Sequence, residues 1–189
     1  MGSEIKALIG SWTTATGTVV SAVSNTPTEA VQNGIKIDLD IIGNELQATG
    51  NSLEADSVDE WNLEKAGLLI QSSGNLTIVA GLLFDMNKRN ELVAIVKGNL
   101  LQALGGSAAL SEALEGERTF IQLMDIYGQA LQVIGNSLQA IAGILELNGE
   151  DNDDLNLAGS WIQATGAVLA ALSLTKSYYL SNNAPASSS

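Results

Sequence analysis

Apolar residues recur along most of this chain at intervals of three and four positions, the spacing of one face of an α-helix. Turns are marked by Pro27, Asn87, Gly116 and the Asn148-Gly149 pair. The pattern predicts six helices, at residues 3–24, 28–55, 58–85, 90–113, 117–147 and 153–180. Because short connections favour antiparallel neighbours, we expect an all-α antiparallel six-helix bundle or short helical repeat array.

Three segments carry helix start signals. Thr26-Pro27-Thr28-Glu29, Ser57-Val58-Asp59-Glu60 and Asp153-Asp154 each combine a capping side chain with acidic residues. A capping oxygen accepts from free backbone N–H groups, and acidic groups are stabilised at a helix N-terminus. These signals set the predicted starts of the second, third and sixth helices.

Glycine returns every seven residues inside the predicted helices, in a unit that reads roughly G-x-x-L-Q-A-x-G-x-x-L. A glycine in a helix interior costs about 0.5–1 kcal/mol relative to alanine, so the repetition must gain something. Close backbone approach between helices is the gain we expect. The predicted helix-packing and self-association residues are Gly10, Gly17, Gly43, Gly50, Gly67, Gly74, Gly98, Gly128, Gly135, Gly159 and Gly166.

The helix at 117–147 illustrates the expected contact face. Leu138, Ile134 and Ile141 form one apolar stripe with Gly135 at its centre. We expect this stripe to face another helix at short distance. Leu46, Leu138 and Leu169 are the expected flanking side chains.

Glutamines repeat beside the glycine stripe, and we expect them to hydrogen-bond across helix contacts or to face water. A polar channel lined by them is a second interpretation. Trp12 and Trp161 are expected to fill the core. The repeated glutamines are Gln47, Gln71, Gln102, Gln132, Gln139 and Gln163.

The repeats also suggest a tandem duplication of a three-helix unit. Gly43 to Gly67 spans 24 residues, and so does Gly135 to Gly159. We therefore expect one helical domain at residues 1–181, with pseudo-repeats at about 3–86 and 90–181. A disordered tail is expected at 182–189, because NNAPASSS is small and polar.

Composition excludes several function classes. The net charge of −13 opposes nucleic-acid binding, which needs clustered Lys or Arg. With no cysteine and no histidine, the chain lacks thiol catalysis, zinc fingers and histidine acid–base chemistry. The acidic run at 150–154 departs from a calcium loop where Leu155 and Asn156 follow it. We expect no enzyme activity, no catalytic residues, no metal site and no cofactor.

The location expected from the sequence is cytoplasmic, because the N-terminus lacks the pattern of a signal peptide. Segments 66–84, 126–145 and 155–175 are long enough to cross a bilayer. Each contains several Gln, Asn, Ser or Thr residues, so permanent insertion is disfavoured. Reversible insertion by a hidden apolar hairpin stays open.

At GNELQATG and GNSLQAIAG the chain resembles a group of small repetitive proteins of unknown function from spore-forming bacilli. The resemblance covers most of the chain through the repeated GN-x-LQA unit. It implies a bacterial structural or sporulation-associated role, and it carries over no catalytic residue.

The predicted function is therefore that of a non-enzymatic structural or interaction protein. We expect it to self-associate through glycine-lined helix faces, as a homo-oligomer or with another helical protein. The alternative is a soluble helical protein that binds or reversibly inserts into membranes, like a pore-former.

Overall fold

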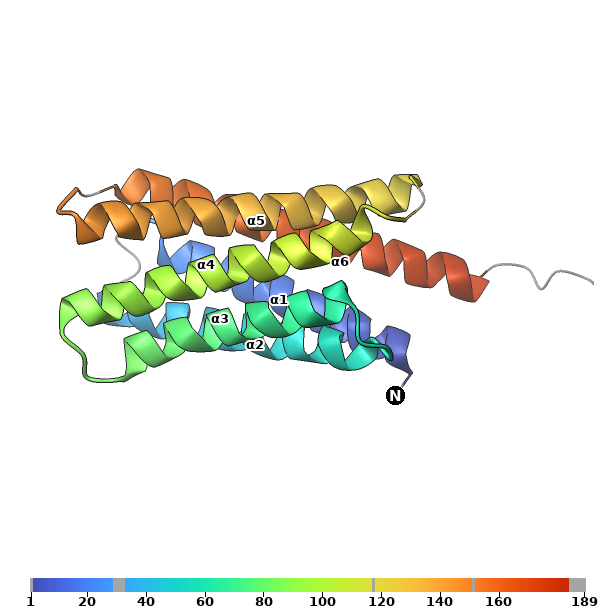
Figure 1. The fold of residues 1–189 in the computed structure, drawn as a ribbon, viewed down its shortest axis with the longest axis horizontal. Helices are drawn as coiled ribbons and strands as arrows, with labels where there is room; N and C mark the ends of the chain where they lie inside the picture. Colours follow the sequence, from blue (N-terminus) through green and yellow to red (C-terminus); the bar gives the residue numbers. More distant parts are fainter. Residues whose placement is uncertain (1, 29–32, 117, 151, 184–189) are drawn as a thin grey trace, which may run out of the picture.

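The computed structural model describes residues 2–28, 33–116, 118–150 and 152–183. These residues form six helices and no strand, which confirms the predicted all-α fold class. The helices run side by side along the long axis of the molecule (Figure 1). Their bounds are α1 Ser3–Ser24, α2 Asn33–Ser57, α3 Leu63–Leu83, α4 Lys88–Ala113, α5 Phe120–Leu147 and α6 Asp153–Asn183.

Asparagine and threonine caps explain where the predicted helix starts were wrong. α3 begins at Leu63 and not at residue 58, because the Asn62 side chain accepts from the Lys65 backbone N–H. Asn87 caps α4 in the same way, so α4 begins at Lys88, two residues before the predicted start. Thr119 caps α5 through the Gln122 N–H, so the predicted start at 117 was early.

Two further predictions concern chain segments at the ends of helices. Thr28 is not helical, so the second helix does not start there as predicted; α2 is described from Asn33, and residues 29–32 lie outside the described part. Asn182 and Asn183 belong to α6, so the predicted tail does not begin at 182. Residues 184–189 of that tail lie outside the described residues.

The helices close into a ring. Within the described part of the chain each helix packs against its neighbours in sequence, and α1 packs against α6 to complete the circle. The packing is densest within the hairpins α1–α2, α3–α4 and α5–α6. The structural unit is thus a two-helix hairpin, whereas the sequence suggested two three-helix units; the duplication itself stays a prediction.

The heptad glycines form the seam of each hairpin. Gly10 faces Gly50 and Gly17 faces Gly43 in the first hairpin, and the other two hairpins repeat this arrangement with two pairs each. A Cβ built on Gly135 would lie 2.6 Å from both the Gly159 carbonyl oxygen and the Gln163 backbone nitrogen. Bare glycine therefore lets the paired backbones approach closely, as small residues do in membrane helix pairs.

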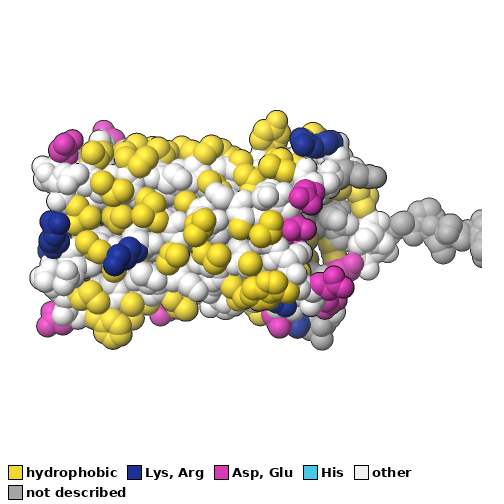
Figure 2. Space-filling model, in the orientation of Figure 1, with side chains coloured by type: hydrophobic (Ala, Val, Ile, Leu, Met, Phe, Trp, Pro, Cys, Tyr) yellow, Lys and Arg dark blue, Asp and Glu magenta, His cyan; other side chains and the backbone are white. Residues whose placement is uncertain are grey.

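The ring is polar inside and apolar outside. The largest fully buried side chains are Asn75, Asn136, Thr18 and Ser160, and most buried apolar residues are alanines. Conversely, Leu76, Leu104 and Tyr127 are 54%, 59% and 62% exposed. Apolar side chains cover much of the face drawn in Figure 2. Ordinary soluble proteins place large aliphatic side chains inside and bury few polar ones.

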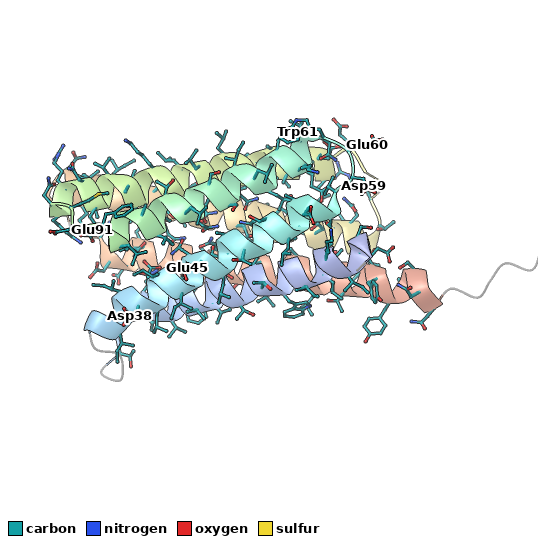
Figure 3. All side chains as sticks on the ribbon, turned by 90° about the horizontal axis from the view of Figure 1, so that it is seen from below. Asp38, Glu45, Asp59, Glu60, Trp61 and Glu91 are labelled. Carbon is teal, nitrogen blue, oxygen red and sulfur yellow. The ribbon has the colours of Figure 1, made fainter. Side chains whose placement is uncertain are left out.

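The closed ring of six helices is called the barrel below. Charged side chains gather towards its two ends (Figure 2). Asp38 and Glu91 lie near one end, and Asp59 and Glu60 lie in the connection at the other (Figure 3). Glu45, in the middle part of α2, is exposed and departs from this distribution (Figure 3). Lys97 on α4 is a second exposed charge away from the helix ends. The outer surface between the ends is otherwise dominated by apolar and small polar side chains.

Candidate functional site

One heptad position lines the axis of the barrel. This position lies four residues after one heptad glycine. Because the glycines are seven residues apart, it also lies three residues before the next glycine. The glutamines Gln47, Gln71, Gln102, Gln139 and Gln163 occupy it, and each is at most 9% exposed. Because a seven-residue repeat keeps one position on one side of a supercoiled helix, polar residues at this position converge inside the ring.

Four glutamines from four different helices close the middle of the axis. Gln163 on α6 donates through Nε2 to Oε1 of Gln47 at 2.9 Å and of Gln102 at 3.1 Å. Gln139 on α5 donates to Gln163 Oε1 at 2.9 Å. Since α6 packs only against α5 and α1 among the described helices, the bonds to α2 and α4 cross the ring. We call Gln47, Gln102, Gln139 and Gln163 the glutamine layer.

A cavity of about 230 Å³ lies on one side of this layer and is lined by all six helices. Three carboxyl side chains border it: Glu54 from α2, Glu64 from α3 and Asp125 from α5. Thr14 Oγ1 donates to Glu54 Oε1 at 3.2 Å, and Gln129 Nε2 donates to Asp125 Oδ2 at 2.7 Å. We call this cavity the acidic chamber.

A second cavity of about 160 Å³ lies towards the opposite end, again lined by all six helices. Three carboxyl side chains, Asp40, Glu146 and Asp153, and one basic side chain, Lys88, border it, so its charge is mixed. Asn44 Nδ2 donates to Asp40 Oδ1 at 3.0 Å. The glutamine layer borders this second chamber. The axis is therefore a polar path in two chambers, closed by side-chain amides between them.

Several buried polar atoms in the described residues have no hydrogen-bond partner. They are both amide atoms of Asn75, Oε1 of Gln129 and Oδ1 of Asn136. An unpaired buried polar atom costs about 1–3 kcal/mol unless water or a ligand satisfies it. Of these residues Gln129 borders the acidic chamber, whereas Asn75 and Asn136 border neither chamber.

The Lys6–Asp56 pair lies outside the chambers. Lys6 Nζ donates to Asp56 Oδ2 at 2.6 Å, and this hydrogen bond holds the pKa of Asp56 below its ordinary value. Neither residue borders the acidic chamber. The chamber's carboxyls therefore have no basic side chain among the residues that line the cavity.

A family model described as a family of unknown function (DUF6944) matches residues 5–171. The match covers most of the chain. The chain belongs to this family. No curated protein and no solved structure matches it.

Membership in a family of unknown function agrees with part of the predicted resemblance. The GN-x-LQA motif as a family signature and the origin in spore-forming bacilli stay predictions. In this DUF6944 chain four of the described helices, α3 to α6, are long and apolar enough to cross a membrane.

The predicted contact glycines all lie in the hairpin seams of this DUF6944 chain. Each of Gly10, Gly17, Gly43, Gly50, Gly67, Gly74, Gly98, Gly128, Gly135, Gly159 and Gly166 would place a Cβ within 3.0 Å of atoms of the paired helix. The glycine faces of each helix are therefore already in contact with the paired helix of the same chain. Self-association through these faces stays a prediction.

The predicted orientation of the apolar stripe was wrong. Ile134 and Ile141 are 48% and 47% exposed, and Leu46, Leu138 and Leu169 are only partly buried. Trp12 and Trp161, expected in the core, are 39% and 41% exposed. The polar face turns inward, so these large side chains take the outer surface.

The sequence offered two interpretations of the glutamines: hydrogen bonds across helix contacts, or the lining of a polar channel. Different glutamines fit each interpretation. Gln47, Gln102, Gln139 and Gln163 bond across helices, as expected, but they do so across the ring. Gln71 and Gln132 border the acidic chamber instead.

Sequence reasoning missed the carboxyl side chains of the interior. Glu54 lies four residues after Gly50, and Glu64 and Asp125 lie three before Gly67 and Gly128. This is the heptad position of the glutamines. The spacing of these three carboxyl residues from the heptad glycines therefore indicates that they share the axial position of the glutamines. That spacing does not match any known metal-binding loop.

Proposed function

We propose that this protein is a membrane-embedded helical barrel that provides a polar path across a bilayer, held closed by the glutamine layer. The role is non-enzymatic: the interior carries amides and carboxyls around a path. The sequence prediction gave reversible membrane binding or insertion as its alternative and disfavoured permanent insertion; this proposal departs from it by placing the barrel in the membrane permanently.

The inverted polarity of the barrel carries the proposal. Among the described residues the largest fully buried side chains are polar, while 26 large apolar side chains are exposed. In water this arrangement forgoes the burial of apolar surface, the dominant favourable contribution to folding. In lipid the same surface is solvated, and polar groups find partners only inside the ring. Helices α3 to α6 also have the length and composition of membrane spans.

The polar interior supports a path rather than a solid polar core. Two chambers of about 230 and 160 Å³ lie on the axis and are each lined by six helices. Charged or polar groups inside a membrane protein typically mark an ion or solvent pathway. Separation of the side chains of the glutamine layer would join the two chambers.

The α1–α2 hairpin fits the bilayer less well than the rest. Neither α1 nor α2 is among the four candidate spans, and Glu45 is exposed on α2. A carboxylate at the bilayer centre costs about 2.5–3.5 kcal/mol on insertion scales. Lys97 can extend its long stem towards the headgroups. The charge of Glu45 is thus the main feature that opposes full immersion.

The exposed apolar surface also supports a second function, self-association in water. A large apolar patch commonly marks a contact with protein or membrane. This second proposal keeps the predicted homo-oligomer, but its contacts are the outer Leu and Ile side chains in place of the glycine faces. It is the outcome to expect if lipid does not bind.

Substitution of Leu100, which is 49% exposed on α4, separates the two functions. Leu100→Asp places a charge in the outer apolar surface. We expect it to weaken insertion by about 3 kcal/mol and so to reduce co-flotation with phosphatidylcholine–phosphatidylglycerol vesicles after a high-salt wash. Leu114→Asp is the matched control, because Leu114 caps the end of the same helix and is 44% exposed.

In a water-exposed monomer both substitutions would change stability by only about 0.5 kcal/mol or less, and neither protein would float. Wild-type protein that stays with the aqueous fraction contradicts the membrane proposal. If that protein also grows in mass with concentration, the self-association proposal takes its place.

A further inference from the structure

We infer that the acidic chamber binds a hydrated metal cation, so that the path selects cations. The cation-binding inference concerns the chamber itself; the selectivity rests on the proposed function. A cation site deepens that function by naming the class of solute the path admits.

The charge of the chamber points to a cation. Glu54, Glu64 and Asp125 reach it from three different helices, and Glu54 and Glu64 each interact electrostatically with Asp125. No lysine or arginine is among the described residues that line the cavity. Burial raises the pKa of Glu54 to about 8 and that of Asp125 to about 6, and the neighbouring carboxyls add to both shifts. A bound cation in the same space would stabilise the ionised carboxylates and offset that cost.

Unpaired amides in the chamber form a second, independent observation. Gln71 is 8% exposed and borders the cavity, and its side chain has no hydrogen-bond partner among the described residues. Gln129 donates to Asp125, but its Oε1 is buried without a partner. Amide and carboxylate oxygens are the ligands that hard cations prefer. Gln71 and Gln129 both line the same cavity as the three carboxyl side chains.

The spacing of these groups favours a hydrated ion. The described carboxyls do not form a group close enough to hold a bare metal ion directly. The cavity of about 230 Å³ has room for several water molecules as well as an ion. Water in the inner coordination sphere would bridge the ion to the carboxyls and amides.

Equilibrium dialysis of the full chain in detergent tests the site, with ⁴⁵Ca²⁺ and ⁸⁶Rb⁺ as separate probes. We expect wild-type protein to bind one of the two ions in excess of detergent alone. The variant Glu54→Gln/Glu64→Gln/Asp125→Asn should bind it about tenfold more weakly or worse. Glu64→Gln alone, in the first turn of α3, should weaken binding by a smaller factor.

The matched control, Asp59→Asn/Glu60→Gln/Glu115→Gln, replaces the same number of carboxyl groups at exposed positions at the same end of the barrel. It should bind as wild type does. Equal binding by the chamber variant and the control variant overturns the inference, and so does a wild-type chain that binds neither ion. Because dialysis needs no bilayer, its failure is distinct from a failure of vesicle flotation, which tests the proposed function.

Discussion

At the scale of single residues, Gln163 has the largest share in holding the axis closed. Its amide donates to Gln47 and Gln102 and accepts from Gln139, so one side chain joins four helices. Amides can both donate and accept, and this allows a closed network without any charge. A residue of equal size without polar atoms would fill the space but leave three partners unpaired.

Gln163→Met is therefore expected to lower stability by about 2–4 kcal/mol, because buried amides lose their partners. For a chain of this length that corresponds to a fall of roughly 5–10 °C in the unfolding midpoint. Circular dichroism in detergent measures it. Gln132→Met, which alters an axial glutamine outside the layer, is the control, and an equal midpoint in wild type and Gln163→Met would contradict the role of the layer.

Glu45 offers the reverse test. Glu45→Gln keeps the shape of an exposed side chain and removes its charge. If lipid covers this face, the variant should partition into vesicles more strongly, by up to about 2–3 kcal/mol. Partition between vesicles and buffer, measured over a lipid titration, checks this. Equal partition of variant and wild type would show that α2 does not contact the acyl chains.

At the scale of elements, the hairpin seam explains why glycine repeats. The pairs Gly10–Gly50 and Gly135–Gly159 bring two backbones together with no side chain between them. Carbonyl oxygens then meet glycine Cα–H groups, a weak contact that recurs in tightly packed helix pairs. The helix propensity lost at each glycine is offset by close packing along the whole seam.

Gly135→Ala tests this directly. Its Cβ would meet backbone atoms at 2.6 Å, so the hairpin must separate. We expect a net loss of about 1–3 kcal/mol from overpacking, although alanine favours the helix itself. Ser137→Ala, on the same helix and only partly buried, is the control and should change the unfolding midpoint little. A midpoint for Gly135→Ala at or above that of wild type would contradict the seam.

The sequence was sufficient to predict the helices, because the spacing of apolar residues is a local property. The first helix was predicted with the correct bounds, while the starts of α3, α4 and α5 depended on Asn62, Asn87 and Thr119. These caps are local too, but several residues nearby could have served equally well. The glycine register was also visible, and with it the residues that share a face.

The sequence could not show what each helix face contacts. A heptad pattern states that Ile134 and Ile141 lie together, but not whether they meet protein, lipid or water. The prediction of an inward stripe, with Trp12 and Trp161 in the core, follows only if the exterior is water. The closure of the ring by α1 and α6 was equally hidden, because it joins residues far apart in the chain. Without that closure, Glu54, Glu64 and Asp125 have no common space.

At the scale of the whole molecule, the proposal makes stability depend on the solvent. A barrel with an apolar exterior should remain a single chain where detergent covers it. In buffer alone the same surfaces should associate, since apolar area is removed from water by contact. Light scattering over a dilution series checks this: we expect constant protein mass in detergent and a mass that rises with concentration without it. A constant monomer in both solvents would contradict the apolar exterior.

The most direct measurement of the central claim uses the tryptophans. Trp161 is 41% exposed on α6, and Trp61 is 73% exposed in the connection between α2 and α3 (Figure 3). Single-tryptophan chains, with the other two replaced by phenylalanine, are reconstituted into vesicles and their fluorescence is quenched in turn by brominated acyl chains and by iodide. The account predicts that brominated lipid quenches Trp161 and iodide does not, with iodide quenching Trp61. Quenching of Trp161 by iodide, with none from brominated lipid, would contradict it.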